Sequence, residues 1–188
     1  MTITETTIPG VLLVDPVVHG DARGFFVERY HAARYADAGI GPAFVQDNHS
    51  RSRRGVLRGL HFQVRRPQGK LVEVLAGSLY DVVVDVRPGS PTFGRWEGFT
   101  LDAAEHRQLW VPPGLAHGFC VVSDEVDFLY KCTDVYDSGD EGGLAWDDPD
   151  LGIDWPSDAP TLSDKDRSLP SLRDLTDLPD APFEAPAR

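Results

Sequence analysis

Cysteine and long hydrophobic runs are both scarce in this sequence. The 188 residues include two cysteines, Cys120 and Cys132, each within an apolar run. Disulfide-rich secreted scaffolds carry many more cysteines in shorter chains, so we expect two buried thiols and a cytoplasmic location. No run approaches the 18 apolar residues of a membrane span, and residues 1–10 lack the basic and apolar regions of a signal peptide. We therefore expect no membrane association and no signal peptide.

Basic residues are also in short supply. Eighteen Lys and Arg stand against thirty Asp and Glu, which gives a formal net charge of -12 and a pI near 4.8. Proteins that bind nucleic acid through its phosphates need a basic surface, so we expect no nucleic-acid partner. A few arginines gathered in one cavity can still bind a small anionic ligand.

Helical periodicity is rare, whereas prolines and glycines separate many short apolar runs. The clearest strand is 79–87, in which Asp81 and Val83 share one face and Val82 and Val84 share the other. The other predicted strands are 10–14, 25–29, 56–63, 70–76, 96–101, 108–111, 118–122 and 126–132, and the predicted short helices are 31–38 and 171–175. The pattern predicts an all-β sandwich or barrel with a few short helices. We expect one domain over residues 1–188, with a C-terminal tail that wraps the surface from about residue 156.

The first cluster of chemically active side chains lies on the strand 56–63 and just beyond it. Alternation places His61 and Gln63 on one face of this strand and Phe62 on the other. A single histidine on a strand is more often part of the core than of a site. Here Arg58 and Lys70 are close in sequence, and several polar groups in one apolar stretch favour a shared cavity.

A second cluster, Pro112, Gly114 and His117, matches the PxGxxH pattern of cupin barrels. A tight turn beside a structural histidine explains the same residues without a site. Many cupins bind a metal through two histidines separated by one residue, but here that stretch reads His61-Phe62-Gln63. Two histidines are fewer than the three or four ligands that a transition metal needs, so we expect no metal.

Two further segments have an ordinary structural interpretation and a functional one. Tyr130 is in phase with Phe128 and Cys132, which is typical of an interior tyrosine in a β-sandwich. The run 162–166, Leu-Ser-Asp-Lys-Asp, is by itself a solvated turn.

Taken together, the motifs resemble the dTDP-4-dehydrorhamnose 3,5-epimerase family of cupin-type sugar-nucleotide epimerases. The resemblance runs in order through DARGFFVE (21–28), QDNHS (46–50), VLRGLHFQ (56–63), GSPTFGRW (89–96), PPGLAHGF (112–119), LYKCTDVY (129–136) and LSDKD (162–166). It implies a jelly-roll barrel, a homodimer, a dTDP-4-keto-6-deoxyhexose substrate and no cofactor.

The resemblance also implies roles for individual residues. His61 matches the general base, Asp166 its carboxylate partner, Lys70 the cation beside the ketone oxygen and Tyr130 the general acid, while Tyr136 matches an aromatic that stacks on thymine. Positions that contact the nucleotide, the diphosphate or the sugar are matched by Arg23, Glu28, Gln46, Asn48, Arg58, His117, Glu141 and Lys165.

Elementary chemistry agrees with these implied roles. Epimerisation beside a carbonyl needs a base, a positive charge near the enolate oxygen and a proton donor on the opposite face. The expected function is therefore epimerisation of dTDP-4-keto-6-deoxyglucose at C3 and C5 through an enolate. The alternatives are an epimerase acting at C3 alone or C5 alone, a non-catalytic cupin that binds a sugar nucleotide, and a metal-dependent cupin oxygenase or isomerase.

Overall fold

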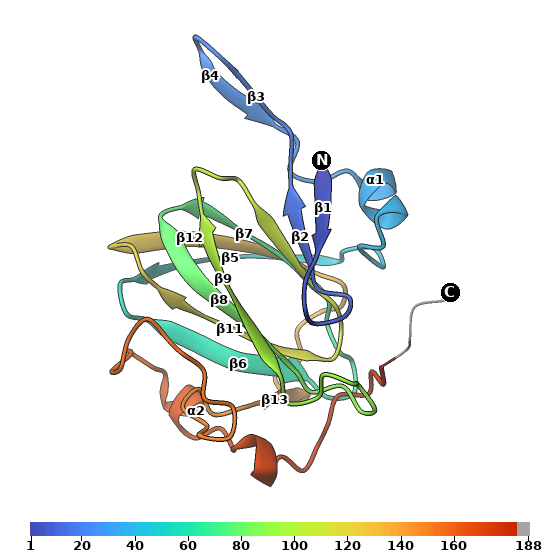
Figure 1. Cartoon of the computed structure of the whole chain (residues 1–188), viewed down its shortest axis with the longest axis vertical. Helices are drawn as coiled ribbons and strands as arrows, with labels where there is room; N and C mark the ends of the chain where they lie inside the picture. The colour runs from blue at the N-terminus through green and yellow to red at the C-terminus, as the bar shows by residue number, and fades with distance from the viewer. Residues whose placement is uncertain (184–188) are drawn as a thin grey trace.

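Two β-sheets packed face to face form the body of the protein (Figure 1). The computed structural model describes residues 1–183. One sheet has the strand order β1-β2-β10-β7-β12-β5 and the other β13-β6-β11-β8-β9. Their strands are β1 (Thr2–Glu5), β2 (Leu12–Asp15), β10 (Gln108–Val111), β7 (Lys70–Ala76), β12 (Glu125–Cys132) and β5 (Gln46–Arg53), and then β13 (Glu141–Gly143), β6 (Leu57–Gln63), β11 (Leu115–Val121), β8 (Ser78–Asp85) and β9 (Trp96–Asp102). The all-β prediction is confirmed.

Alternating side chains fill three apolar layers. Val83 and Phe119 from one sheet meet Val74 and Phe128 from the other in the central core. The outer face of the five-stranded sheet is covered by the C-terminal segment, including Trp155, Leu162 and Leu172. Part of the outer face of the six-stranded sheet, over β2, β10 and β7, is covered by α1 (Ala32–Asp37), which buries Tyr35. The five-stranded sheet is therefore apolar on both faces, which explains the continuous hydrophobic runs of β8 and β11.

Strand prediction fails where strands are polar or very short. Strand β5, with the sequence QDNHSRSR, was not predicted because it has no apolar face: its alternate residues from Gln46 to Ser52 are at least partly buried, and the others are exposed. β1, β13 and the hairpin strand β3 (Val18–Asp21) were also missed. The strand predicted at 118–122 begins earlier, at Leu115, so His117 lies on β11 itself rather than at the end of a turn.

The C-terminal segment contains more local structure than its composition predicts. The run 162–166 is not a solvated turn, because it forms the short helix α2 (Asp164–Arg167), in which Asp166 is buried. A second short element, the 3-10 helix η1 (Leu172–Asp174), lies within the predicted helix 171–175. Thr161 is tied to β6 by the hydrogen bond from the Leu57 N–H to its carbonyl. The segment is thereby fixed beside β6, which brings Asp166 toward the interior.

A two-stranded hairpin stands apart from both sheets. Its strands β3 (Val18–Asp21) and β4 (Gly24–Val27) pair only with each other, and the hairpin projects from the body (Figure 1). Within residues 1–183, no helix is long and apolar enough to cross a membrane.

Candidate active site

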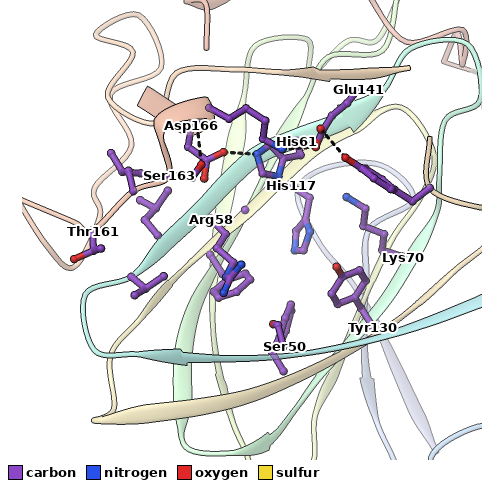
Figure 2. A pocket seen from close by; sticks show the side chains of 18 residues that line it. Ser50, Arg58, His61, Lys70, His117, Tyr130, Glu141, Thr161, Ser163 and Asp166 are labelled. Carbon is purple, nitrogen blue, oxygen red and sulfur yellow. Dashed lines mark hydrogen bonds and ion pairs between the residues drawn. The ribbon is translucent and has the colours of Figure 1, made fainter. Parts of the chain in front are cut away.

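A cavity of about 650 Å³ opens between the two sheets (Figure 2). Its lining includes nine of the residues predicted for the site: Arg58, His61, Lys70, His117, Tyr130, Tyr136, Glu141, Lys165 and Asp166. They come from both sheets, from the loop after β12 and from α2, so only the folded chain brings them together.

His61 and Asp166 form a hydrogen-bonded pair on one wall. The distance between His61 Nε2 and Asp166 Oδ1 is 2.6 Å. The Asp166 side chain is buried, while His61 keeps about a quarter of its surface exposed to the cavity. Burial raises the pKa of Asp166, but the hydrogen bond and charge of His61, with smaller contributions from Ser163 and Lys165, more than offset this, so its pKa lies below the usual value. An anionic carboxylate on Nε2 leaves Nδ1 as the nitrogen available to accept a proton.

Helix capping explains how Asp166 reaches His61. Ser163 is the N-cap of α2, and its hydroxyl accepts a hydrogen bond from the Asp166 N–H at 3.1 Å. The cap fixes the first turn of a helix that is too short to be stable alone.

Tyr130 and Lys70 occupy the opposite side of the cavity, on the six-stranded sheet (Figure 2). Tyr130 packs against the central core, and burial raises its pKa, so its hydroxyl remains a proton donor at neutral pH. Burial lowers the pKa of Lys70, and the nearby Cys132, Asp81 and Glu141 partly offset this effect. The Lys70 ammonium makes no hydrogen bond or ion pair to any of residues 1–183.

His117 has its own carboxylate partner, which sequence reasoning missed. Its Nε2 lies 2.9 Å from both Oδ1 and Oδ2 of Asp81, and both side chains are buried. The missed signal is the position of Asp81 in phase with Val83 on the buried face of β8, because a buried charge needs a partner.

Tyr136, Glu141 and Lys165 form a connected group where the loop after β12 meets α2. The Tyr136 hydroxyl donates to Glu141 Oε2 at 3.1 Å, and Lys165 Nζ donates to Glu141 Oε1 at 2.8 Å. Tyr136 is half exposed, so the face of its ring is accessible to a planar group.

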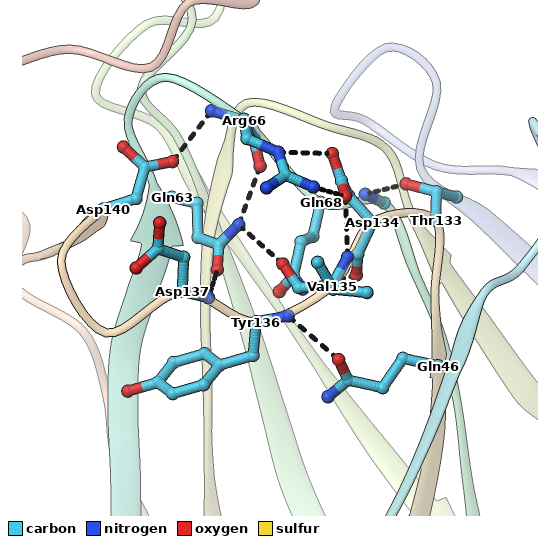
Figure 3. A network of polar contacts seen from close by, with 11 residues as sticks. Gln46, Gln63, Arg66, Gln68, Thr133, Asp134, Val135, Tyr136, Asp137 and Asp140 are labelled. Carbon is cyan, nitrogen blue, oxygen red and sulfur yellow. Dashed lines mark hydrogen bonds and ion pairs between the residues drawn. The ribbon is translucent and has the colours of Figure 1, made fainter.

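A polar network holds the Tyr136 loop in place (Figure 3). Gln63 does not line the main cavity, but it lines an adjoining cavity together with His61, on whose face of the strand it was predicted to lie. Gln63 is buried: its Oε1 accepts from the Asp137 N–H, and its Nε2 donates to the carbonyls of Val135 in the same loop and of Arg66 in the loop after β6. The Tyr136 N–H donates to Gln46 Oε1 at 2.9 Å.

Three further residues predicted to contact the substrate line one or the other of two adjoining cavities. Gln46 and Asn48 line an adjoining cavity of about 240 Å³ that also includes His61, Lys70 and Tyr130. Arg58 lines the main cavity, where its Nε donates to Ser52 Oγ at 3.1 Å.

Arg23 and Glu28 do not line either cavity of their own chain. Arg23 lies in the turn of the projecting hairpin, where it is 90% exposed and pairs with Asp21. Glu28 follows β4 and pairs with Arg34. Their predicted contact with substrate therefore cannot be made within this chain in the conformation seen.

The residues that stand where many cupins have metal ligands, His61, Phe62 and His117, make other contacts in this structure. Phe62 packs in the layer outside the five-stranded sheet, away from the central core. His61 and His117 each use one ring nitrogen on a carboxylate. Within residues 1–183, no group of three His, Cys, Asp or Glu side chains could hold a metal ion.

Comparison with known proteins gives a consistent result. The family model described as dTDP-4-dehydrorhamnose 3,5-epimerase matches residues 5–174. The chain is 52% identical over 181 residues to the dTDP-4-dehydrorhamnose 3,5-epimerase of Pseudomonas aeruginosa, covering 95% of this chain and 100% of the relative.

Solved structures agree with the sequence relatives. A dTDP-6-deoxy-D-glucose-3,5-epimerase from Legionella pneumophila, in complex with dTDP-4-keto-L-rhamnose, has a TM-score of 0.92 and 49% identity, covering 98% of this chain and 99% of that one. A 3'-monoepimerase from Streptomyces bikiniensis, in complex with dTDP-quinovose, has a TM-score of 0.84 and 38% identity, covering 89% and 86%. The chain belongs to the dTDP-4-dehydrorhamnose 3,5-epimerase family of isomerases.

Proposed function

We propose that this protein epimerises dTDP-4-keto-6-deoxyglucose at C3 and C5. The observation that carries the proposal is one cavity in which His61 and Tyr130 lie on opposite walls, with Lys70 beside them (Figure 2). A base and an acid on opposite faces of a sugar ring are what inversion of a carbon centre requires. The family and its relatives support the dTDP-sugar as substrate.

In the proposed mechanism, His61 Nδ1 removes the proton from the carbon next to the C4 ketone. The electron pair of the broken C–H bond forms the enolate double bond, and negative charge moves to the ketone oxygen. Lys70 stabilises that charge. Tyr130 then donates its hydroxyl proton to the opposite face of the carbon, where the enolate electron pair forms the new C–H bond. Tyr130 is reprotonated from solvent, and His61 releases the abstracted proton to solvent. Asp166 stabilises the imidazolium formed on His61.

Deuterium incorporation tests the proposal and separates it from its nearest alternative. In heavy water, the recovered sugar should carry deuterium at both C3 and C5, because the C4 ketone acidifies both positions. Label at C3 alone would favour a 3'-monoepimerase, the activity named for the Streptomyces bikiniensis neighbour. That neighbour is 38% identical to this chain, whereas the Pseudomonas aeruginosa 3,5-epimerase is 52% identical. No label at either carbon, with the sugar nucleotide bound, would favour a non-catalytic cupin.

A Tyr130→Phe variant tests the acid separately from the base. It should still exchange protons through His61 but release less inverted product, because the donor on the opposite face is missing. Unimpaired inversion by this variant would remove Tyr130 from the acid role.

We also propose a homodimer in which the hairpin of each protomer reaches the cavity of its partner. Phe25 and Phe26 on β4 are 62% and 69% exposed, which is costly for an isolated hairpin. Pairing would cover them and would bring Arg23, whose guanidinium suits a diphosphate, toward a substrate. Sedimentation at micromolar concentration should give a dimer mass, and Phe26→Asp should produce monomers with a raised KM. A monomeric wild type would contradict the dimer.

The proposed reaction uses neither a metal nor a nucleotide cofactor, and we place it in the cytoplasm. A metal-free reaction is supported by the carboxylates, which occupy one ring nitrogen of His61 and of His117. A cytoplasmic location is supported by the free, buried thiols of Cys120 and Cys132. Activity should persist after exhaustive chelation. Stoichiometric metal together with loss of activity on chelation would contradict it.

A further inference from the structure

The projecting hairpin is held at its base by a short segment of the body. Among residues 1–183, strands β3 and β4 pair only with each other, so neither sheet orients them. The hairpin leaves the body after β2 and returns to it before α1 (Figure 1). Three consecutive residues, His106, Arg107 and Gln108, contact the chain on both of these sides. We call residues 106–108, which lead from β9 into β10, the clamp segment.

The side on which the chain enters the hairpin is held by an ion pair. Arg107 Nε donates to Asp15 Oδ1 at 2.8 Å, and Asp15 is the last residue of β2. Both side chains are partly exposed, and surface ion pairs contribute little to stability. This contact does not fix the direction of the hairpin by itself.

The side on which the chain leaves the hairpin is held by a buried polar network around Arg29. Gln108 Nε2 donates to the Arg29 carbonyl at 2.8 Å and to Glu73 Oε2 at 3.0 Å. The Tyr35 hydroxyl lies 2.9 Å from the same carbonyl and 2.8 Å from Gln108 Oε1. Arg29 Nε lies 2.5 Å from Glu73 Oε2. Because Tyr35, Glu73 and Gln108 are buried, these contacts hold both the main chain and the side chain of Arg29 against the six-stranded sheet.

His106 adds a contact to a hairpin strand itself. Its ring lies against Phe25 of β4, with the ring centroids 4.5 Å apart, and its Nδ1 is 3.3 Å from Arg29 Nη1. Among residues 1–183, His106 is the one non-glycine residue with a positive φ, at 57°. That conformation is unfavourable for a residue with a side chain and persists where its surroundings hold it. The contacts with Phe25 and Arg29 are such surroundings.

Stability alone does not explain a polar network at this place. Glu73 and Gln108 are cross-strand partners beside an apolar cluster that includes Leu71 and Trp110. Apolar side chains of similar volume would be buried there equally well, because a buried ion pair often stabilises no more than its apolar replacement. Arg29 Nη2 is buried without a hydrogen-bond partner among residues 1–183, which is a further cost. What the network supplies, and apolar packing does not, is a set of directional bonds to the chain that leaves the hairpin.

We infer that the clamp segment, together with Glu73 and Tyr35, is a positioning device that fixes the direction of the hairpin before a second copy of the chain binds. For its effect on substrate, this inference rests on the proposed function, in which the hairpin brings Arg23 to the cavity of the partner. An arm that is already ordered loses less conformational freedom on binding than a mobile one. Loss of the network should therefore weaken substrate binding through Arg23, while His61 and Tyr130, which lie in the body, keep their geometry.

Electron-spin distance measurements test the inference without substrate or partner. Nitroxide labels on Ala22→Cys, in the hairpin turn, and on Asp124→Cys, in the exposed turn before β12, report the direction of the hairpin relative to the body. The native Cys120 and Cys132 are buried, so labelling is selective for the two introduced thiols. Every protein in this experiment also carries Phe26→Asp, so that each hairpin is free of a partner.

With the clamp segment intact, the distance distribution should have one narrow peak. Gln108→Leu, which is similar in volume but lacks the bonds to Arg29 and Glu73, should broaden that peak. The control Glu97→Gln weakens the contact of β9 with Thr7, at the end of β2 away from the hairpin, and should leave the peak unchanged. An unchanged peak in folded Gln108→Leu would overturn the inference. A broad distribution with the clamp segment intact would also overturn it, whether or not Gln108→Leu folds.

Kinetics with Phe26 restored give a readout that a merely structural role would not move. Gln108→Leu should raise KM about tenfold, which corresponds to one charge-assisted hydrogen bond, and leave kcat nearly unchanged. Added to Arg23→Ala, it should raise KM little further, because both changes act through the same contact. A fall in kcat as large as the rise in KM, or fully additive effects of the two substitutions on KM, would show that the network does not act through the hairpin.

The inference and the proposed function can fail separately. If Gln108→Leu broadens the distance distribution but the wild type shows no epimerisation, the proposed function fails and the positioning of the hairpin stands. If the wild type is a monomer with a narrow distribution, the dimer fails and the fixed direction of the hairpin stands.

Discussion

Two histidines that line the same cavity each pair with a carboxylate, but the two pairs differ in how they are built. Asp166 approaches His61 from a helix 105 residues further along the chain, whereas Asp81 approaches His117 from the strand next to β11. His61 keeps 24% of its side chain exposed and His117 keeps 7%. The pKa of Asp166 is lowered in the folded protein, while burial raises that of Asp81.

The difference fits two roles for one chemical motif, of which the proposed mechanism uses one. A base must meet substrate and release its proton, and the proposed base His61 is accordingly accessible, with a buried carboxylate partner that hydrogen bonds stabilise in its charged form. A positioning pair must hold charge and geometry through the whole cycle, so it is buried in the sheet. The predictions below break one pair at a time.

Loss of the base should have the largest effect. His61→Ala should lower deuterium exchange at the ketone's α-carbons by about 10²–10⁴-fold, because it removes the proposed general base, whose contribution is typically of that size. The fold should be retained, as circular dichroism would show. The matched control is His49→Ala, which removes an exposed histidine bound to Asp127 and should leave exchange unchanged. Near-normal exchange in His61→Ala would show that another residue is the base.

Loss of the buried carboxylate should have the largest effect on stability. Asp81→Ala should lower the free energy of unfolding by about 3 kcal/mol, because it leaves His117 buried without its partner. Urea unfolding measures this change. Asp127→Ala, which breaks the surface ion pairs of Asp127 with His49 and Arg51, should cost less than about 1 kcal/mol. Equal costs for the two variants would contradict the assigned difference between the buried and the exposed pair.

Asp166→Asn should impair catalysis less than loss of His61. It removes a charged hydrogen bond of about 1.5–3 kcal/mol, so kcat should fall roughly 10- to 100-fold while the imidazole remains.

The lowered pKa of Asp166 also has a consequence for stability at acid pH. Its stabilising contribution is present above the ordinary pKa of 3.8 and is lost as the pH falls through the lower value of the folded protein. The wild type should therefore lose its stability advantage over Asp166→Asn below about pH 4. An advantage that stays constant down to pH 2 would contradict the lowered pKa.

The smallest expected effect comes from the helix cap that positions Asp166. Ser163→Ala should cost about 1 kcal/mol in local stability and reduce kcat severalfold, because α2 loses its N-cap beside the catalytic pair. Hydrogen exchange of the α2 amides would follow the loosening. Ser171→Ala removes the corresponding cap of η1, away from His61, and should leave kcat unchanged. Equal kinetic effects of the two variants would argue against a role for the cap in positioning Asp166.

Sequence reasoning worked best where side-chain alternation was strong. The strands β7 and β10 were predicted with their observed bounds, and Phe62 lies on the face opposite His61 as predicted. It failed for β5, whose polar inward face lines the site rather than the core. Hydrophobic periodicity cannot detect a strand that faces a cavity.

The sequence by itself determined the all-β class, the two buried thiols and, through its ordered motifs, the family and the catalytic candidates. Tertiary structure alone decided that Asp81 meets His117, since Asp81 lies in an ordinary predicted strand, whereas the family resemblance had already paired Asp166 with His61. It also decided that Gln63 holds a loop and that Arg23 lies outside its own cavity. The physical reason is that local patterns fix which face a side chain takes, whereas contacts between distant segments depend on how the sheets and the C-terminal segment pack together.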